Sequence, residues 1–180
     1  MISYSDKLPA RITLIITLVI STIGCDQATK ILARENLNHG TISFWGDMIR
    51  LQHAENTGAF LSLGAQLPPT LRFLIFTVFV AAFLVVASYL LFKNKNSSPL
   101  ATFGLCLVLA GGLGNLIDRA LRGSVTDFIN VGIGPLRTGI FNVADVAIVA
   151  GVLILILLPK TPRISVPLSK PNVLNNSNES

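Results

Sequence analysis

The sequence predicts an all-α membrane protein, with four transmembrane helices and a small strand-containing extracytoplasmic cap between the first and the second. Two observations lead to this fold class. Hydrophobic residues make up 51% of the 180-residue chain and charged residues only 13%, whereas a soluble domain usually has about a quarter charged residues. Four long apolar segments, separated by polar links, account for the high hydrophobic fraction. The composition therefore argues against a soluble enzyme or a disordered chain.

The four apolar segments have the length and pattern of membrane-spanning helices. They cover residues 11–28, 70–92, 100–117 and 140–158. A spanning helix needs roughly 20 mostly apolar residues, and the first and third segments are near the lower limit. None alternates as a β-barrel strand would, so helices are expected. Pro68 and Pro69 favour a helix start, Pro159 ends the fourth helix, and the Gly-rich residues 110–114 permit close helix approach.

The two links that follow the first and third segments differ in character. Residues 31–67 contain alternating stretches at 41–44 and 48–52, and the only tryptophan, Trp45. Because Trp favours the membrane interface, this link predicts a strand-containing cap that lies there. The link of residues 118–139 is rich in glycine and charge, and is expected to be a loop.

The distribution of charge predicts the orientation of the chain. With four spans both termini lie on one side, and each side carries seven basic residues. On the side of the termini these face only two acids, against seven on the other side. Because the positive-inside rule counts basic residues near helix ends, the unpaired charges indicate cytoplasmic termini. We expect one membrane domain at residues 1–159 and a polar, disordered cytoplasmic tail at residues 160–180.

A set of polar residues falls on the side opposite the termini, whichever way the chain inserts. They come from both links on that side and from three helix ends, so a bundle would gather them into one site at the membrane face. Ionisable groups at membrane depth are costly and are candidates for function. The set comprises Asp26, Asn56, Asn115, Asp118, Asp127, Asn142 and Asp145.

Asp127 and Asp145 form the pair best suited to catalysis. Two close carboxyl groups in a poorly solvated site share a proton, because both cannot easily ionise. One can then take a proton from water while the other donates a proton to the carbonyl oxygen or the leaving amine. Aspartyl peptide hydrolysis needs this pair and no metal ion.

Structural roles for the same acids are open alternatives. Asn142 could cap the fourth helix, and Asp145 would then occupy the third helical position, where an acid suits the helix dipole. Asp127 could be a solvated loop acid. The i,i+4 spacing of a simple ion pair occurs twice, at Asp118 and Arg122 and at Asp26 and Lys30.

Other chemistries find little support in the sequence. The two histidines are not part of an HExxH pattern and no Cys/His cluster has metal-ligand spacing, so neither a metal ion nor another cofactor is expected. There is no GxSxG motif, and Ser62 lacks an evident His or Lys partner. Two cysteines do not make a disulfide framework. Cys25 follows an apolar stretch, as in a lipoprotein signal peptide, but that leaves three later spans unexplained.

Five short motifs stand in order among the four segments. They are DQATK at 26–30, NTGAFLS at 56–62, GGLGNLIDR at 111–119, GSVTDFI at 123–129 and FNVAD at 141–145. Together they resemble the lipoprotein signal peptidases (type II signal peptidases) of bacteria. Phe60 arrives one residue earlier than in the commonest form of that family, Ser124 stands where an aromatic residue is common, and residues 131–140 lack the aromatics often seen there.

The resemblance implies an aspartyl endopeptidase of the bacterial cytoplasmic (inner) membrane, with its active site at the extracytoplasmic face. It would remove signal peptides from prolipoproteins by cutting before the cysteine that carries diacylglycerol, and globomycin-type compounds would inhibit it. A monomer that contacts membrane lipid and binds no nucleic acid is implied as well. Asp127 and Asp145 match the catalytic pair of the family. The matched supporting residues are Asp26, Asn56, Gly58, Asn115, Arg119 and Asn142.

Three other interpretations compete with this one. A proton or ion carrier also uses intramembrane acids, but here the acids gather at one face and form no path across. An intramembrane protease of the presenilin kind would need an Asp where Asn115 follows Gly114, and the span count is small. A purely structural membrane module is the third alternative.

Overall fold

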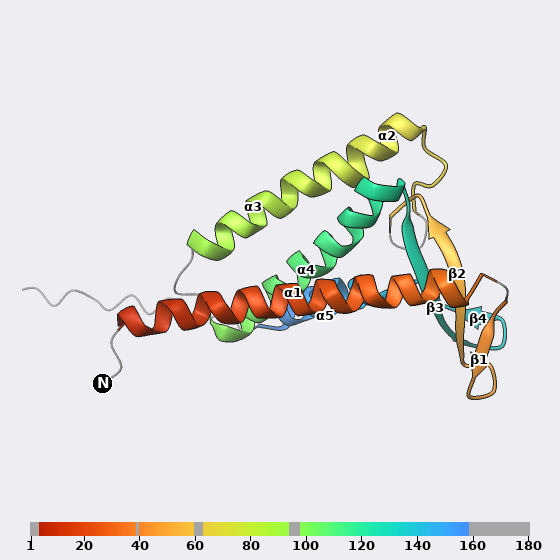
Figure 1. Ribbon diagram of the computed structural model, residues 1–180, viewed down its shortest axis with the longest axis horizontal. Coiled ribbons are helices and arrows are strands. Elements are labelled where there is room, and N and C mark those ends of the chain that lie inside the picture. Colours follow the sequence, from red (N-terminus) through yellow and green to blue (C-terminus); the bar gives the residue numbers. More distant parts are fainter. Residues whose placement is uncertain (1–3, 39, 60–62, 94–97, 159–180) are drawn as a thin grey trace, which may run out of the picture.

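A computed structural model describes residues 4–38, 40–59, 63–93 and 98–158. Within these residues the chain forms a helical bundle with a four-stranded sheet at one end (Figure 1). The helices are α1 (Tyr4–Asn36), α2 (Pro69–Phe73), the π-helical turn η2 (Leu74–Phe79), α3 (Val80–Lys93), α4 (Pro99–Arg122) and α5 (Val143–Leu157). The strands are β1 (Ile42–Phe44), β2 (Ile49–Asn56), β3 (Val125–Ile133) and β4 (Leu136–Arg137).

Several of the helices have the length and composition of membrane spans. In the described part of the chain, three are long and apolar enough to cross a membrane: Pro9–Asn36, Pro69–Lys93 and Pro99–Arg122. The second of these joins α2, η2 and α3 into one rod, and Pro69 takes a first-turn position where its missing N–H costs nothing. α5 is equally apolar but has only 15 residues. The first three predicted spans are therefore confirmed as helices of spanning length, and the fourth crossing stays a prediction.

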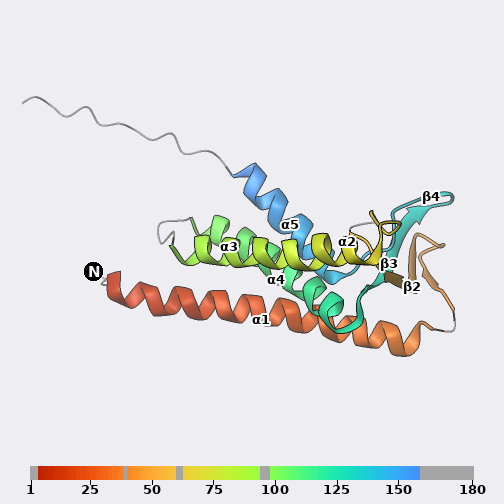
Figure 2. The same ribbon diagram turned by 90° about the horizontal axis from the view of Figure 1, so that it is seen from above.

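Successive rods run in alternating directions. As a result, α1 and α4 end beside the sheet, whereas α2 and α5 begin there (Figures 1 and 2). α4 packs against α1, α3 and α5, which makes it the central helix. The link between α1 and α2 and the link between α4 and α5 therefore lie at the same end of the bundle, where both contribute strands to the sheet.

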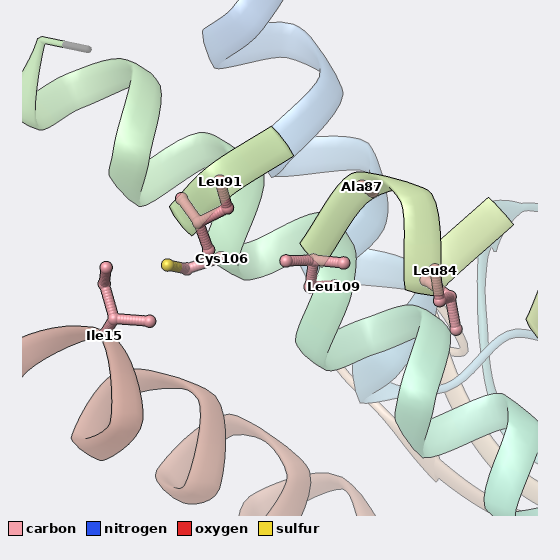
Figure 3. Packing of buried hydrophobic residues seen from close by; sticks show 6 residues of the cluster. All are labelled: Ile15, Leu84, Ala87, Leu91, Cys106 and Leu109. Atoms are coloured by element: carbon pink, nitrogen blue, oxygen red, sulfur yellow. The ribbon is translucent and has the colours of Figure 1, made fainter. Parts of the chain in front are cut away.

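The apolar core lies between α1, α3 and α4, at the end of the bundle away from the sheet. Its buried residues are Ile15, Leu84, Ala87, Leu91, Cys106 and Leu109 (Figure 3). On the outward faces of the helices, large apolar side chains such as Ile20, Phe79 and Ile156 expose most of their surface. Apolar side chains on both the inside and the outside are typical of helices surrounded by lipid.

Small residues bring α4 and α5 close together. Gly111 lies against the carbonyl of Ala144, which leaves no space for a side chain. A Cβ on Gly104 would lie 3.0 Å from the carbonyl oxygen of Gly151. Small residues allow such approach of two helix backbones. The predicted close approach at residues 110–114 is confirmed, and it fixes α5 against α4 at the height of Asp145.

The sheet is antiparallel and has the order β1-β2-β3-β4. The predicted cap strands at residues 41–44 and 48–52 are confirmed as β1 and β2. The predicted helical membrane fold with a small strand-containing cap is confirmed in part, by three helices of spanning length and the sheet. The expectation of a loop at residues 118–139 is wrong, because α4 continues to Arg122 and β3 follows. The glycine and charge that indicated a loop lie at the ends of β3, where Gly123 terminates α4 with a φ of 76°. The cap is thus built from both links.

Candidate active site

Asp145 is held by the start of its own helix. Asn142 caps α5, and its Oδ1 accepts a hydrogen bond of 2.9 Å from the backbone N–H of Asp145. In return, Asp145 Oδ2 accepts one of 3.2 Å from the N–H of Asn142. This reciprocal capping box satisfies two otherwise unpaired donors at the helix end. The predicted capping role of Asn142 is confirmed, and it also fixes the direction of the Asp145 side chain.

Asp127 is the third residue of β3, opposite Ala54 of β2. Its side chain is almost fully buried, so the alternative of a solvated loop acid is wrong. Asp127 Oδ2 accepts a hydrogen bond of 2.9 Å from Asn56 Nδ2, and Oδ1 accepts one of 2.6 Å from Asn142 Nδ2. Asn56 is itself oriented, because its Oδ1 accepts a bond of 2.9 Å from the N–H of Gly58.

Asn115 of α4 completes the connection between the two acids. Its Nδ2 donates to Asp145 Oδ1 at 2.9 Å, and its Oδ1 accepts from Asn142 Nδ2 at 3.1 Å. The Asn142 amide therefore bonds to Asp127 and to Asn115 together. Three asparagines from three elements thus hold Asp127 and Asp145 side by side.

The surroundings change the acidity of Asp127. Burial raises the pKa of this carboxyl from its ordinary value of 3.8 to about 6. The hydrogen bond from Asn56 lowers the pKa, the negative charge of Asp145 raises it, and the bond from Asn142 lowers it again. A carboxyl group that titrates this close to neutral pH can both hold and release a proton during a reaction.

The two acids line the wall of a cavity of about 230 Å³. Its polar wall also includes Asn56, Asn115 and Arg119, and the remainder is apolar. Arg119 donates from Nη2 to the carbonyl of Gly58 at 2.7 Å. Its Nε is buried and has no hydrogen-bond partner among the residues that the structure describes. The cavity therefore combines two acids with an unused donor.

A second, more open cavity of about 530 Å³ lies along α5. Thr138 and Phe141 line it on the side of the sheet, and apolar residues down to Leu153 line it on α5. Asp145 and Val149 belong to the walls of both cavities. Asp145 thus stands between a cavity with a polar wall and an almost wholly apolar groove.

A buried ion cluster lies directly behind the two acids. Lys30 Nζ is 2.9 Å from Asp26 Oδ2 and 3.1 Å from Asp118 Oδ2, and all three side chains are shielded from solvent. Asp118 also pairs with Arg122 at 3.0 Å. Both ion pairs expected from the i,i+4 spacing are therefore confirmed. The structure adds that Lys30 joins them into one cluster.

The predicted site residues divide into three groups. Asn56, Asn115, Arg119, Asp127 and Asp145 line the first cavity. Asn142 and Gly58 hold these residues from behind, as their hydrogen bonds show. Asp26 is more remote: it faces Lys30, and its Oδ1 accepts a bond of 2.9 Å from the N–H of Ala144 at the start of α5.

Some expectations concern residues away from this site. Ser62 and Phe60 lie outside the described residues, as does the tail at residues 160–180. Cys25 lies on an exposed face of α1, which continues without a break to Asn36. The described residues offer no group of three His, Cys, Asp or Glu side chains that could hold one metal ion.

Two residues near the site were missed by the sequence prediction. Lys30 donates to Asn115 Oδ1 at 2.9 Å and so touches the network of the two acids. Thr126 of β3 donates its N–H to Asp118 Oδ2 at 3.2 Å. The i,i+4 spacing of Lys30 with Asp26 was the available signal, but nothing local distinguishes a buried pair from a surface pair.

Comparisons with known proteins agree with this geometry. A model of the signal peptidase (SPase) II family matches residues 18–159. The chain belongs to the signal peptidase II family. It is 37% identical to the lipoprotein signal peptidase of Borrelia duttonii (strain Ly) over 139 residues, which is 73% of this chain and 81% of the relative. It is 39% identical to that of Enterococcus faecalis (strain ATCC 700802 / V583) over 132 residues, 73% of this chain and 78% of the relative.

Solved structures extend the likeness to the fold. One bacterial membrane enzyme superimposes with a TM-score of 0.71 at 27% identity, covering 81% of this chain and 86% of its own. A second has a TM-score of 0.68 at 25% identity, covering 83% and 96%. Membership of the signal peptidase II family makes this chain a peptidase, and its apolar helices make it a bacterial membrane protein.

Proposed function

We propose that this signal peptidase II is an aspartic endopeptidase that removes the signal peptide from diacylglyceryl-modified prolipoproteins and cuts before the lipidated cysteine. One observation carries the proposal. Asp127 and Asp145 are held at the wall of one cavity by the shared amides of three asparagines. Neither acid contacts a basic side chain among the bonds and ion pairs of the described residues, so their protons remain available for chemistry.

The proposed reaction uses the two acids as a pair that shares one proton. The ionised carboxylate takes a proton from a water molecule, whose oxygen attacks the scissile carbonyl carbon. The protonated carboxyl gives its proton to the carbonyl oxygen, and a tetrahedral diol forms. The first acid then returns its proton to the leaving amine as the C–N bond breaks, and the diol proton returns to the second acid. A pKa of about 6 for Asp127 suits this exchange.

The two cavities beside Asp145 suit a substrate that is part peptide and part lipid. The cavity with the polar wall offers the guanidinium of Arg119 to a peptide carbonyl. The apolar groove along α5 offers a surface for acyl chains next to the cleavage point. Burial of apolar area stabilises such a complex by about 25 cal/mol per Å². Globomycin-type inhibitors would compete for the same space.

The proposed topology has four crossings and cytoplasmic termini. α5, with 15 residues, would span about 22 Å at the usual rise, which is short for a bilayer core of about 30 Å. The first turn of α5 carries Asp145 and lies beneath the sheet. If this turn begins below the membrane surface, α5 has to cross only the part of the bilayer between Asp145 and the cytoplasmic face. In this proposal residues 1–159 form a monomeric domain with the sheet and the acids at the extracytoplasmic face, and residues 160–180 a cytoplasmic tail.

The test is cleavage of a synthetic precursor that carries a diacylglyceryl cysteine by the full-length protein in lipid-containing micelles. Asp127→Asn and Asp145→Asn should each abolish cleavage, and a globomycin-type inhibitor should stop the wild-type protein. Glu55→Gln is the matched control, because Glu55 lies on β2 next to Asn56 and its side-chain bonds within the described part of the chain are to His53, Ser124 and Thr126. Normal cleavage by a folded Asp127→Asn or Asp145→Asn variant would overturn the proposal. Equal cleavage of the unlipidated precursor would overturn its substrate.

A further inference from the structure

Lys30 is a charged side chain that the reaction described above does not use. It lies on α1, and its side chain is fully shielded from solvent. It borders neither of the two cavities next to Asp145. Two of its three partners are the acids Asp26 and Asp118, and these alone would explain its presence as a structural ion. The third partner is Asn115, which bonds directly to Asp145.

The bond to Asn115 has a direction that matters for the site. An ammonium group has only donors, so the Asn115 atom that faces Lys30 at 2.9 Å is the amide oxygen. The amide nitrogen of Asn115 therefore points toward Asp145, where it donates to Oδ1. If the amide turned over, it would place its oxygen against a carboxylate oxygen and its NH2 group against an ammonium group. Lys30 thus acts together with Asn142 Nδ2, which also donates to Asn115 Oδ1, against the orientation that would leave Asp145 Oδ1 without this donor.

We infer that Lys30 is a positioning residue of the candidate dyad: its buried ammonium fixes the Asn115 amide toward Asp145 and supplies a positive charge that keeps the pair of acids partly ionised. This inference rests on the proposed function, since it concerns the same two acids. It assigns no contact with substrate to Lys30.

The charges around the pair support the electrostatic part. The ammonium of Lys30 reaches Asp145 through one amide, at two bonds of 2.9 Å each. Its charge lowers the pKa of Asp127, against the larger effect of burial. At this range and in a partly buried site, one charge changes a carboxyl pKa by about one unit. The other charged groups that face the pair or Lys30 are Asp26 on α1 and Asp118 and Arg119 on α4, with Arg122 paired to Asp118.

The first experiment compares Lys30→Met with the wild type in cleavage of the lipidated precursor across pH. We expect kcat to fall about 10-fold to 100-fold, because the Asn115 amide loses one of the two donors that orient it and keeps only Asn142 Nδ2, while KM changes little, because Lys30 does not line the cavity. We also expect the acidic limb of the kcat profile to move up by about one pH unit. A merely structural lysine would reduce the amount of active protein without moving the limb.

Loss of the ammonium also leaves Asp26 and Asp118 with one partner fewer, which could destabilise the fold. A second variant therefore removes one positive and one negative charge together. Lys30→Gln combined with Asp118→Asn keeps polar groups at both positions. Neutral replacement of both members of a buried ion pair is often tolerated. Asp26 then keeps the N–H of Ala144 and the amide of Gln27 as donors. This double variant should melt close to the wild type and still show the upward shift of the acidic limb.

Arg34→Met is the matched control. Arg34 lies one turn beyond Lys30 on α1 and donates to Thr126 Oγ1 at 2.9 Å, away from Asn115. Its replacement removes a positive charge from the same helix and should leave kcat and the acidic limb unchanged within about twofold and a few tenths of a pH unit.

The outcomes separate this inference from the proposed function. A folded Lys30 variant with the wild-type kcat and pH profile overturns the positioning role, even if Asp127→Asn and Asp145→Asn are inactive. Collapse of the charge-balanced variant also overturns it and makes Lys30 architectural. If the two Asn variants themselves remain active, the proposed function fails first.

Discussion

Two groups of buried acids lie at the same end of the molecule and differ in their partners. Asp26 and Asp118 are paired with the ammonium of Lys30. Asp127 and Asp145 accept hydrogen bonds from neutral amides and face a cavity. Burial is therefore not what distinguishes the two groups, because Asp118 and Asp127 are both almost inaccessible to solvent. The partners distinguish the roles: Asp26 and Asp118 form ion pairs with Lys30, whereas Asp127, held by neutral amides, can exchange a proton.

The paired acids also accept backbone N–H groups from neighbouring elements of the fold. Asp26 receives the N–H of Ala144 at the start of α5, and Asp118 receives the N–H of Thr126 in β3. Through Lys30 these bonds join α1, α4, α5 and β3. The residues that hold Asp127 and Asp145 together lie on α4, β2, β3 and the start of α5. The ion cluster thus connects all of these elements except β2.

The largest expected effect is on catalysis, from replacing the dyad. Asp127→Asn and Asp145→Asn should each lower kcat/KM for the lipidated precursor by about 10³-fold or more. The double variant should lose no more than either single variant, because two acids that act on one water molecule are not independent. Kinetics on the three purified variants measure this. Losses that multiply in the double variant would show that the acids act separately.

The second effect is on folding, from breaking the ion cluster. Asp118→Asn should lower the free energy of unfolding by about 3 kcal/mol, because it leaves Lys30 and Arg122 with one anion fewer. Asp127→Asn is the matched control and should destabilise the protein less, since Asp127 forms no ion pair among the described residues and the change affects only its hydrogen bonds with the amides of Asn56 and Asn142. Denaturant unfolding in micelles gives both values. Equal destabilisation by the two variants would contradict the division of the acids into two groups.

The candidate dyad could be predicted from the sequence, whereas the ion cluster could be predicted only in part. The apolar segments and the dyad could be predicted because their signals are local: uninterrupted hydropathy, and acids beside Gly- and Asn-containing motifs. The role of Lys30 could not, because Asp26 and Lys30 at i,i+4 look the same on a solvated helix. Only the contact with Asp118, 88 residues along the chain from Lys30, buries the pair.

Strand β3 was missed for a similar reason, because its partner strand is distant in the sequence. β3 pairs with β2 across about 70 residues of chain, with Ala54 opposite Asp127. No local pattern contains that partner, and the flanking glycines and charged residues indicated a loop. β2 carries a bulge between Leu51 and Ala54. Such a bulge shifts the alternation of side chains, so even a correct strand prediction would not have placed Asn56 next to Asp127.

The third effect concerns pH and stability. Asp127 has a pKa of about 6 in the folded protein and an ordinary value of 3.8, so the folded state binds more protons between these values. Its contribution is therefore most favourable below about pH 4 and is lost as the pH rises through 6, which lowers the free energy of unfolding by about 3 kcal/mol in all and by about 2 kcal/mol between pH 4 and pH 7. The Asn side chain does not titrate, so the unfolding free energy of Asp127→Asn relative to that of the wild type should rise by about 2 kcal/mol from pH 4 to pH 7. A constant difference would contradict the raised pKa.

The smallest effect should come from the outermost member of the ion cluster. The Arg122 side chain is 36% exposed, whereas its partner Asp118 is fully buried. Arg122→Gln should cost less than about 1 kcal/mol, because water replaces the guanidinium while Asp118 keeps Lys30 and the N–H of Thr126. The cost should shrink further in high salt, which screens an exposed charge more than a buried one. A loss as large as that of Asp118→Asn, unchanged by salt, would mean that Arg122 and not Lys30 is the main partner of Asp118, and that the exposed ion pair stabilises the cluster more than the buried one does.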